Sequence, residues 1–147
     1  MRELILILHI ITSVVACILT GVILVRGIGG LYFKFKLKKL DVQLPFYATM
    51  LLYLQFVLGT ILFVMYMIEF SSGEINVYQN QVVKGRFWAV EHFILMVFTL
   101  VISHIGWVFA KSNHTPKLIF KKNFLYFGIA CTMIMVSMVM NIIRYAF

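Results

Sequence analysis

Two histidines, His9 and His92, are the residues of this 147-residue chain whose type and position most clearly predict chemistry. Each follows the start of a long apolar segment, Leu4 or Phe87, by five residues. At 1.5 Å per residue, both imidazoles then lie about 7 Å below the same membrane edge. Ionisable side chains at such a depth are costly and usually face a bundle interior at a functional site. Two imidazoles at one level, on helices that face each other, predict a bis-histidine site for haem b.

The segments that must position these histidines are four apolar blocks, at residues 4–25, 46–68, 87–110 and 124–143. The chain is 63% hydrophobic and 12% charged, whereas a soluble domain carries about 25% charged residues. Each block has about the 20 residues that a membrane-spanning helix needs. The first block is too long for a signal-peptide core, so we expect it to remain as a helix. We therefore predict an all-α membrane protein, a single domain over 1–147 with four transmembrane helices in an up-down-up-down bundle.

Basic residues predict the orientation of this bundle. The second loop holds only Lys84 and Arg86, together with Glu69 and Glu74, and Arg2 is a small contrary signal. The other two loops are rich in lysine and arginine: Arg26, Lys34, Lys36, Lys38 and Lys39 in the first, and Lys111, Lys117, Lys121 and Lys122 in the third. The positive-inside rule places these two loops in the cytoplasm and both termini in the periplasm of a bacterial inner membrane. The net charge of +8 then reflects topology and anionic-lipid contact rather than nucleic-acid binding.

Helix ends are predicted from glycine and proline. The run from Arg26 to Gly30, Arg-Gly-Ile-Gly-Gly, is expected to end the first helix. Pro45 suits the first turn of the second helix.

In such a bundle the first and third helices lie diagonally opposite. Adjacent axes are about 8–10 Å apart, so diagonal axes are roughly 12–14 Å apart, which leaves room for a porphyrin between two axial imidazoles. The face through His9 continues with Ser13, and the face through His92 continues with Met96 and Thr99. Small or weakly polar residues favour faces between membrane helices, so both histidines are expected to point inward, with Met96 as a wall of the pocket.

Further polar residues gather at the same predicted level. Arg86 opens the third span and Arg144 closes the fourth, and either guanidinium would pair well with a haem propionate. Glu91, beside His92, is expected to orient an imidazole or to relay a proton. The alternative for these residues is an interfacial cap of salt bridges, with the arginines reaching toward lipid headgroups.

Gln55 and His104 leave more than one interpretation open. Gln55, one turn before Gly59, either bonds across helices or contacts a quinone head group or a haem edge. His104 follows His92 by twelve residues, which displaces it by about 18 Å along the helix and about 120° around it. We therefore expect His104 to pack, contact quinone or handle protons rather than to ligate a second haem. Cys17 and Cys131 lie within spans and are expected to be buried small hydrophobes rather than a disulfide or redox pair.

These residues also carry a resemblance to a known family. The chain resembles the small four-helix membrane proteins of Bacteroidota commonly labelled cytochrome b, over nearly its whole length. The similar motifs are Leu8-His9, Leu54-Gln55-x-x-Leu58-Gly59, Arg86-x-Trp88-Ala89-Val90-Glu91-His92 and Ile105-Gly106 followed by a basic loop. The chain has Tyr53 where family members often have a histidine, and Phe93 where a proline often follows the Glu-His pair. The resemblance implies haem without implying a particular reaction.

The leading hypothesis is thus a haem b electron carrier or redox subunit, rather than a stand-alone enzyme, that exchanges electrons with quinone or a partner membrane subunit. Within the bilayer it is expected to assemble with such subunits or with copies of itself. The first alternative is a non-catalytic accessory subunit whose polar residues hold a larger complex together. The second is a small proton- or metal-handling membrane protein that uses His9, Glu91 and His92.

Overall fold

The computed structural model describes residues 2–71, 79–112 and 115–146, and within these it describes only the backbone at 70, 79–88 and 141–146. The described chain is helical apart from residues 33–38 and 115. Its helices are α1 (Arg2–Tyr32), α2 (Lys39–Ser71), α3 (Gln79–Ser112), α4 (Pro116–Lys122) and α5 (Gly128–Ala146). A π-helical turn, Asn123–Phe127, joins α4 directly to α5.

Within the described residues, four stretches of helix are long and apolar enough to cross a membrane: Arg2–Tyr32, Lys39–Glu69, Ala89–Ser112 and Pro116–Met140. They confirm the prediction of an all-α chain with four candidate spans. Many of the large side chains on the outer surface are apolar, as Leu4, Ile18 and Val25 illustrate with about 60% exposure each. Such a surface is compatible with contact with a lipid bilayer.

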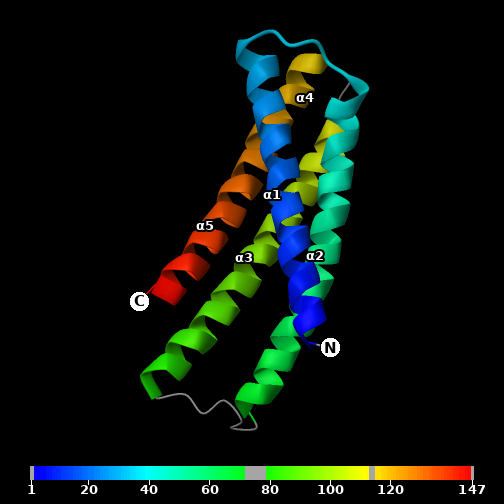
Figure 1. The fold of residues 1–147 in the computed structure, drawn as a ribbon. Helices are drawn as coiled ribbons and strands as arrows, with labels where there is room; N and C mark the ends of the chain where they lie inside the picture. The colour runs from blue at the N-terminus through cyan, green and yellow to red at the C-terminus, as the bar shows by residue number, and fades with distance from the viewer. Residues whose placement is uncertain (1, 72–78, 113–114, 147) are drawn as a thin grey trace.

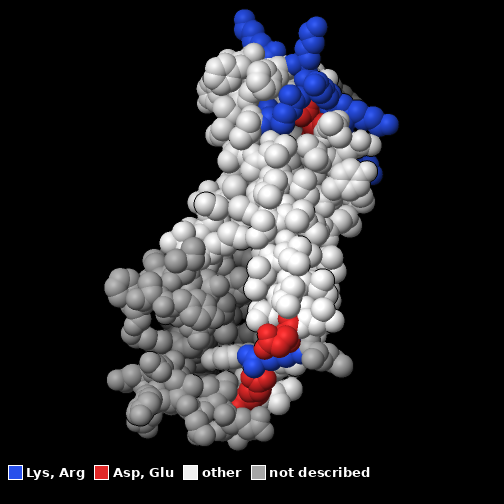
Figure 2. Space-filling view, in the orientation of Figure 1, with Lys and Arg blue, Asp and Glu red and all other residues white. Residues whose placement is uncertain are grey.

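The helices pack side by side, and Figure 1 shows consecutive long helices running in opposite directions. Helix α1 packs against α2 and α5, and α3 packs against the same two helices. Helices α1 and α3 therefore lie diagonally across the bundle. Figure 2 shows that lysines and arginines gather at the end formed by residues 33–41 and α4, above an uncharged middle.

Small and hydroxyl-bearing side chains form much of the core of the bundle, beside larger apolar ones such as Ile23 and Phe127. Its most buried members include Ala16, Thr20, Ala48, Thr49, Thr99, Ser103, Ala110 and Ala130. Three of the hydroxyls are satisfied within their own helices: Thr20 donates to Ala16 O, Thr49 to Pro45 O and Thr99 to Leu95 O. Small residues let the helix backbones approach closely, which drives packing where the surrounding lipid is as apolar as the helices.

The prediction that the glycines after Arg26 end the first helix is wrong, because α1 continues to Tyr32. The glycines serve close packing instead. A Cβ at Gly27 would lie 2.9 Å from the backbone N of Phe124, and one at Gly30 would overlap the ring of Phe120. The glycines that were expected to break the helix instead leave a groove on the surface of α1, and this groove receives α4 and the π-helical turn.

The expected position of Pro45 in the first turn of its helix is also wrong. Helix α2 begins at Lys39, so Pro45 lies inside it and cannot donate a hydrogen bond to the carbonyl of Asp41. The side-chain amide of Asn123 donates to that carbonyl instead, at 2.9 Å. The Asp41 carboxylate is fully buried and is held by Arg26 through two hydrogen bonds of 2.7 Å. This cluster fixes α1, α2 and the π-helical turn together at the lysine-rich end.

Candidate functional site

The structure places His9 of α1 and His92 of α3 side by side across the bundle. Their ring centres are 6.2 Å apart and their planes meet at 76°. Both side chains are half-buried. Because α1 and α3 are diagonal, the two imidazoles meet between α2 and α5 rather than at a contact of neighbouring helices.

Gln55 of α2 holds His9 in place. Its amide nitrogen lies 3.2 Å from His9 Nε2 and also donates to Ser13 Oγ, and its carbonyl oxygen accepts a hydrogen bond from Thr12. Gln55 is itself buried. Three polar groups of α1 therefore converge on one amide of α2, in agreement with the interpretation that Gln55 bonds across helices. The participation of Thr12 was not expected.

Ser137 of α5 is a partner of His92 that sequence reasoning missed. Its Oγ lies 2.5 Å from His92 Nδ1. Ser137 is buried in an apolar helix, and a buried hydroxyl of this kind is a signal for a partner on a neighbouring helix. With Ser137 included, all four spans contribute a polar side chain to the site.

The separation of the two rings is compatible with a pair of imidazoles that bind one metal. A metal–imidazole bond is about 2 Å long, so the centres of two imidazoles on opposite sides of one metal lie about 6 Å apart. His92 has its Nδ1 engaged by Ser137, the arrangement that orients a histidine whose other nitrogen binds a metal. His9 Nδ1 is buried and has no hydrogen-bond partner among the described residues. An unsatisfied buried nitrogen is unfavourable, and a missing ion or ligand is one physical reason for it.

A glycine gives the His9 ring its space. A Cβ at Gly59 would lie 3.1 Å from His9 Cε1, closer than most real Cβ contacts. Any side chain at this position of α2 would press on the imidazole. The Leu54-Gln55-x-x-Leu58-Gly59 motif thus places a hydrogen-bonding amide and an open position, one turn apart, against the same histidine.

The remaining predicted site residues are less closely connected. Glu91 is half-buried, and no hydrogen bond or ion pair links it to another described side chain. Met96 is also half-buried, one turn along α3 from His92. The side chains of Arg86 and Arg144 lie outside the described residues. Within the described part of the chain, no group of three or more His, Cys, Asp or Glu side chains could hold a metal ion.

His104 belongs to a separate aromatic cluster between α2 and α3. Its Nδ1 lies 3.1 Å from the hydroxyl of Tyr53, and its ring packs edge-on against Trp107 with centres 5.3 Å apart. This agrees with the expected packing role. The position where the resembling family often has a histidine therefore carries a tyrosine that bonds to His104.

The two cysteines lie near each other, on α1 and α5. The Cys17 thiol donates to Met135 Sδ at 3.6 Å, and Met135 lies one turn of α5 beyond Cys131. Both thiols are free and half-buried, so they are less enclosed than the sequence suggested.

Comparison with known proteins adds no relative: no family model, curated protein or solved structure matches the chain. The resemblance to the cytochrome b-like membrane proteins therefore rests on the short motifs quoted above.

Proposed function

We propose that this protein binds haem b between His9 and His92 and carries electrons within a membrane. The observation that carries the proposal is the 6.2 Å separation of two imidazole rings that come from diagonal membrane helices. Ionisable residues rarely occur at such positions without a function. When bound, haem supplies a one-electron carrier whose potential depends on its ligands and surroundings.

The chain's own residues have distinct roles in this proposal. His9 and His92 bind the iron, Ser137 orients His92 through Nδ1, and Gln55 orients His9. Met96 is a wall of the pocket, and Glu91, Arg86 and Arg144 are the candidates for propionate or proton contacts.

The electron partners of this carrier are a quinone or a neighbouring redox subunit, and its location is the inner membrane of a bacterium. Both termini lie in the periplasm, as does the histidine end of the bundle. Two observations support this orientation. Lysines and arginines gather at the opposite end of the bundle, and Arg2, a cation whose side chain is described at the histidine end, is paired with Glu69 at 2.9 Å. By the positive-inside rule the lysine-rich end faces the cytoplasm.

Absorption spectroscopy of the full-length protein, purified in detergent after expression with haem supplied, tests the cofactor. We expect a b-type α band after reduction with dithionite. His9→Ala and His92→Ala each abolish the low-spin spectrum, because each removes one axial ligand. His104→Ala is the matched control, since it removes a membrane histidine that bonds to Tyr53 instead, and it leaves the band in place.

Carbonate extraction of membranes checks that each variant is inserted, because one residue scarcely changes the hydrophobicity that drives insertion. A wild-type protein without an α band contradicts the proposal, and so do His9→Ala and His92→Ala proteins that both keep it. Reporter fusions at the C-terminus and within residues 31–44 test the orientation separately. A cytoplasmic C-terminus would place the histidine pair near the inner face of the membrane.

A second candidate is a non-catalytic subunit of a larger membrane complex. The observation that favours it is the hydrogen-bond network itself, because Gln55 ties α2 to α1 and Ser137 ties α5 to α3 without any cofactor. Under this hypothesis the purified protein has no haem spectrum, and the histidine variants are less stable but spectrally unchanged.

A further inference from the structure

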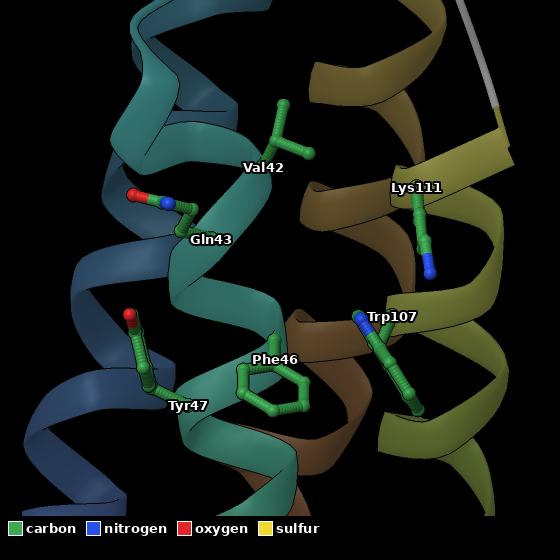
Figure 3. Close-up of a pocket in the computed structure, with 6 residues that line it drawn as sticks. All are labelled: Val42, Gln43, Phe46, Tyr47, Trp107 and Lys111. Carbon is green, nitrogen blue, oxygen red and sulfur yellow. The ribbon is translucent and has the colours of Figure 1, made fainter.

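A groove of about 370 Å³ lies between α2 and α3 at the lysine-rich end of the bundle. Figure 3 shows its two walls. Val42 and Phe46 extend from α2 toward α3, and Trp107 and Lys111 extend from α3. Phe46 and Trp107 meet at the lower end of the groove, with ring centres 5.3 Å apart. The groove is open to the surroundings, since Phe46 is 38% exposed and Lys111 is also exposed.

The polar groups of the α3 wall are hydrogen-bond donors without acceptors. In Figure 3 the Lys111 amine extends down the groove beside Trp107. Neither this amine nor the indole N–H of Trp107 donates to a described residue. The acidic side chain described at this end, Asp41, is buried and already bound by Arg26. A cation and an indole N–H with no protein acceptor favour an oxygen-bearing anion.

The position of the groove in the bundle indicates which kind of anionic ligand binds there. Lys111 lies near the end of a membrane-spanning helix, and Trp107 lies one turn deeper, where amphipathic rings favour the membrane interface. Basic pockets between helices on the cytoplasmic side bind anionic lipid headgroups. A quinone fits less well, because the ammonium group favours a charged ligand. Trp107 is also fifteen residues from His92, or about 22 Å along the helix.

We propose that this groove is a binding site for an anionic phospholipid of the lysine-rich leaflet. The lipid phosphate accepts hydrogen bonds from Lys111 Nζ and Trp107 Nε1. The glycerol backbone and the start of an acyl chain lie on Phe46 and Val42. The rings of His104 and Tyr53, whose centres are 6.1 Å apart, lie between α2 and α3 below the groove, toward the middle of the membrane. This site is independent of haem binding.

Native mass spectrometry of the full-length protein in a nonionic detergent tests the site with phosphatidylglycerol as the probe and phosphatidylcholine as the comparison. We expect retention of one phosphatidylglycerol in preference to phosphatidylcholine. Lys111→Gln lowers this retention about tenfold, the effect of losing one charge-assisted hydrogen bond. Lys117→Gln is the matched control: it removes the same charge from an exposed position on α4, and it leaves retention unchanged.

A second measurement follows Trp107 directly. In a Trp88→Phe background, phosphatidylglycerol with brominated acyl chains quenches the remaining tryptophan more than brominated phosphatidylcholine does, and Lys111→Gln removes the difference. Equal losses for Lys111→Gln and Lys117→Gln overturn the proposal in favour of general surface charge. Displacement of the lipid by inorganic phosphate overturns it in favour of a free-anion site. Retention of added menaquinone instead of phosphatidylglycerol assigns the groove to quinone and also overturns it.

Discussion

Replacing Gln55 by leucine is the change that most directly tests how the histidine site is held together. The substitution keeps the size of the side chain and removes all of its polar atoms. Gln55 connects α2 to Thr12, Ser13 and His9 of α1. The variant therefore breaks three cross-helix hydrogen bonds at once without opening a large cavity.

The size of the expected loss in stability depends on whether each partner of Gln55 can form another hydrogen bond once Gln55 is replaced. Thr12 keeps a second acceptor, the carbonyl of Leu8 at 2.8 Å. The Ser13 hydroxyl can turn to the carbonyl one turn back in its own helix. His9 has no such alternative, because its Nδ1 already lacks a partner among the described residues. Cross-helix hydrogen bonds in membranes contribute about 0.6 kcal/mol on average and at most about 1.7 kcal/mol, so we expect a loss of about 1–2 kcal/mol, mostly through His9.

Unfolding of the purified protein in mixed micelles with increasing sodium dodecyl sulfate, followed by circular dichroism, measures this loss. Gln43→Leu is the matched control. It is the same substitution on the same helix, and the side chain of Gln43 makes no hydrogen bond to a described residue. We expect it to alter the free energy of unfolding by less than about 0.5 kcal/mol. The same pair of variants is then measured in a His9→Ala background.

The double-mutant cycle decides whether the reasoning is right. If the loss acts through His9, Gln55→Leu costs about 1 kcal/mol less when His9 is already absent. An undiminished cost in the His9→Ala background would show that Gln55 does not act through the imidazole. A cost equal to that of Gln43→Leu would show that the hydrogen bonds contribute nothing measurable.

Two further predictions concern the lysine-rich end, and both are measured by the same unfolding assay. Gly27→Ala destabilises the protein by about 1–3 kcal/mol, because its Cβ would lie 2.9 Å from the backbone of Phe124. The control Gly21→Ala has nothing within 4 Å of its Cβ, so it is neutral or stabilising by up to about 1 kcal/mol. Equal effects of the two substitutions would contradict the packing argument. Asp41→Ala costs about 2–3 kcal/mol, below the usual figure for a broken buried pair because Arg26 is 24% exposed, and a neutral result would mean that the pair does not stabilise the fold.

The sequence was sufficient to predict the four helical spans and the closeness of the two membrane histidines. Both follow from one-dimensional information: hydropathy fixes the length of a span, and distance from its start fixes the depth of a residue. The ligand role of His9 and His92 remains a prediction. Thr12 and Ser137 were missed because a hydroxyl's partner depends on how its helix is rotated against its neighbours, which hydropathy does not report.

The lysine-rich end shows why local signals were misinterpreted. Glycine and Pro45 indicate breaks when only their own helix is considered. Here the cost of the interior proline is offset by Asn123, which lies 82 residues from the carbonyl it satisfies, and the glycines of α1 gain close contact with Phe120 and Phe124. In each case a tertiary contact overrides a local preference, and no single segment of the sequence contains both partners.

The two ends of the bundle differ in how tightly they are packed. At the lysine-rich end, a Cβ at Gly27, Gly30 or Gly106 would meet α4 or the π-helical turn at close range. Toward the other end, a Cβ at Gly59 would meet only the His9 ring, at 3.1 Å. Figure 1 shows α3 and α5 leaning away from α1 and α2 in this direction. The end fixed by the Arg26–Asp41 pair stabilises the bundle. The histidine pair lies toward the other end, where its 6.2 Å separation already suits the proposed ligand pair without a rearrangement of the helices.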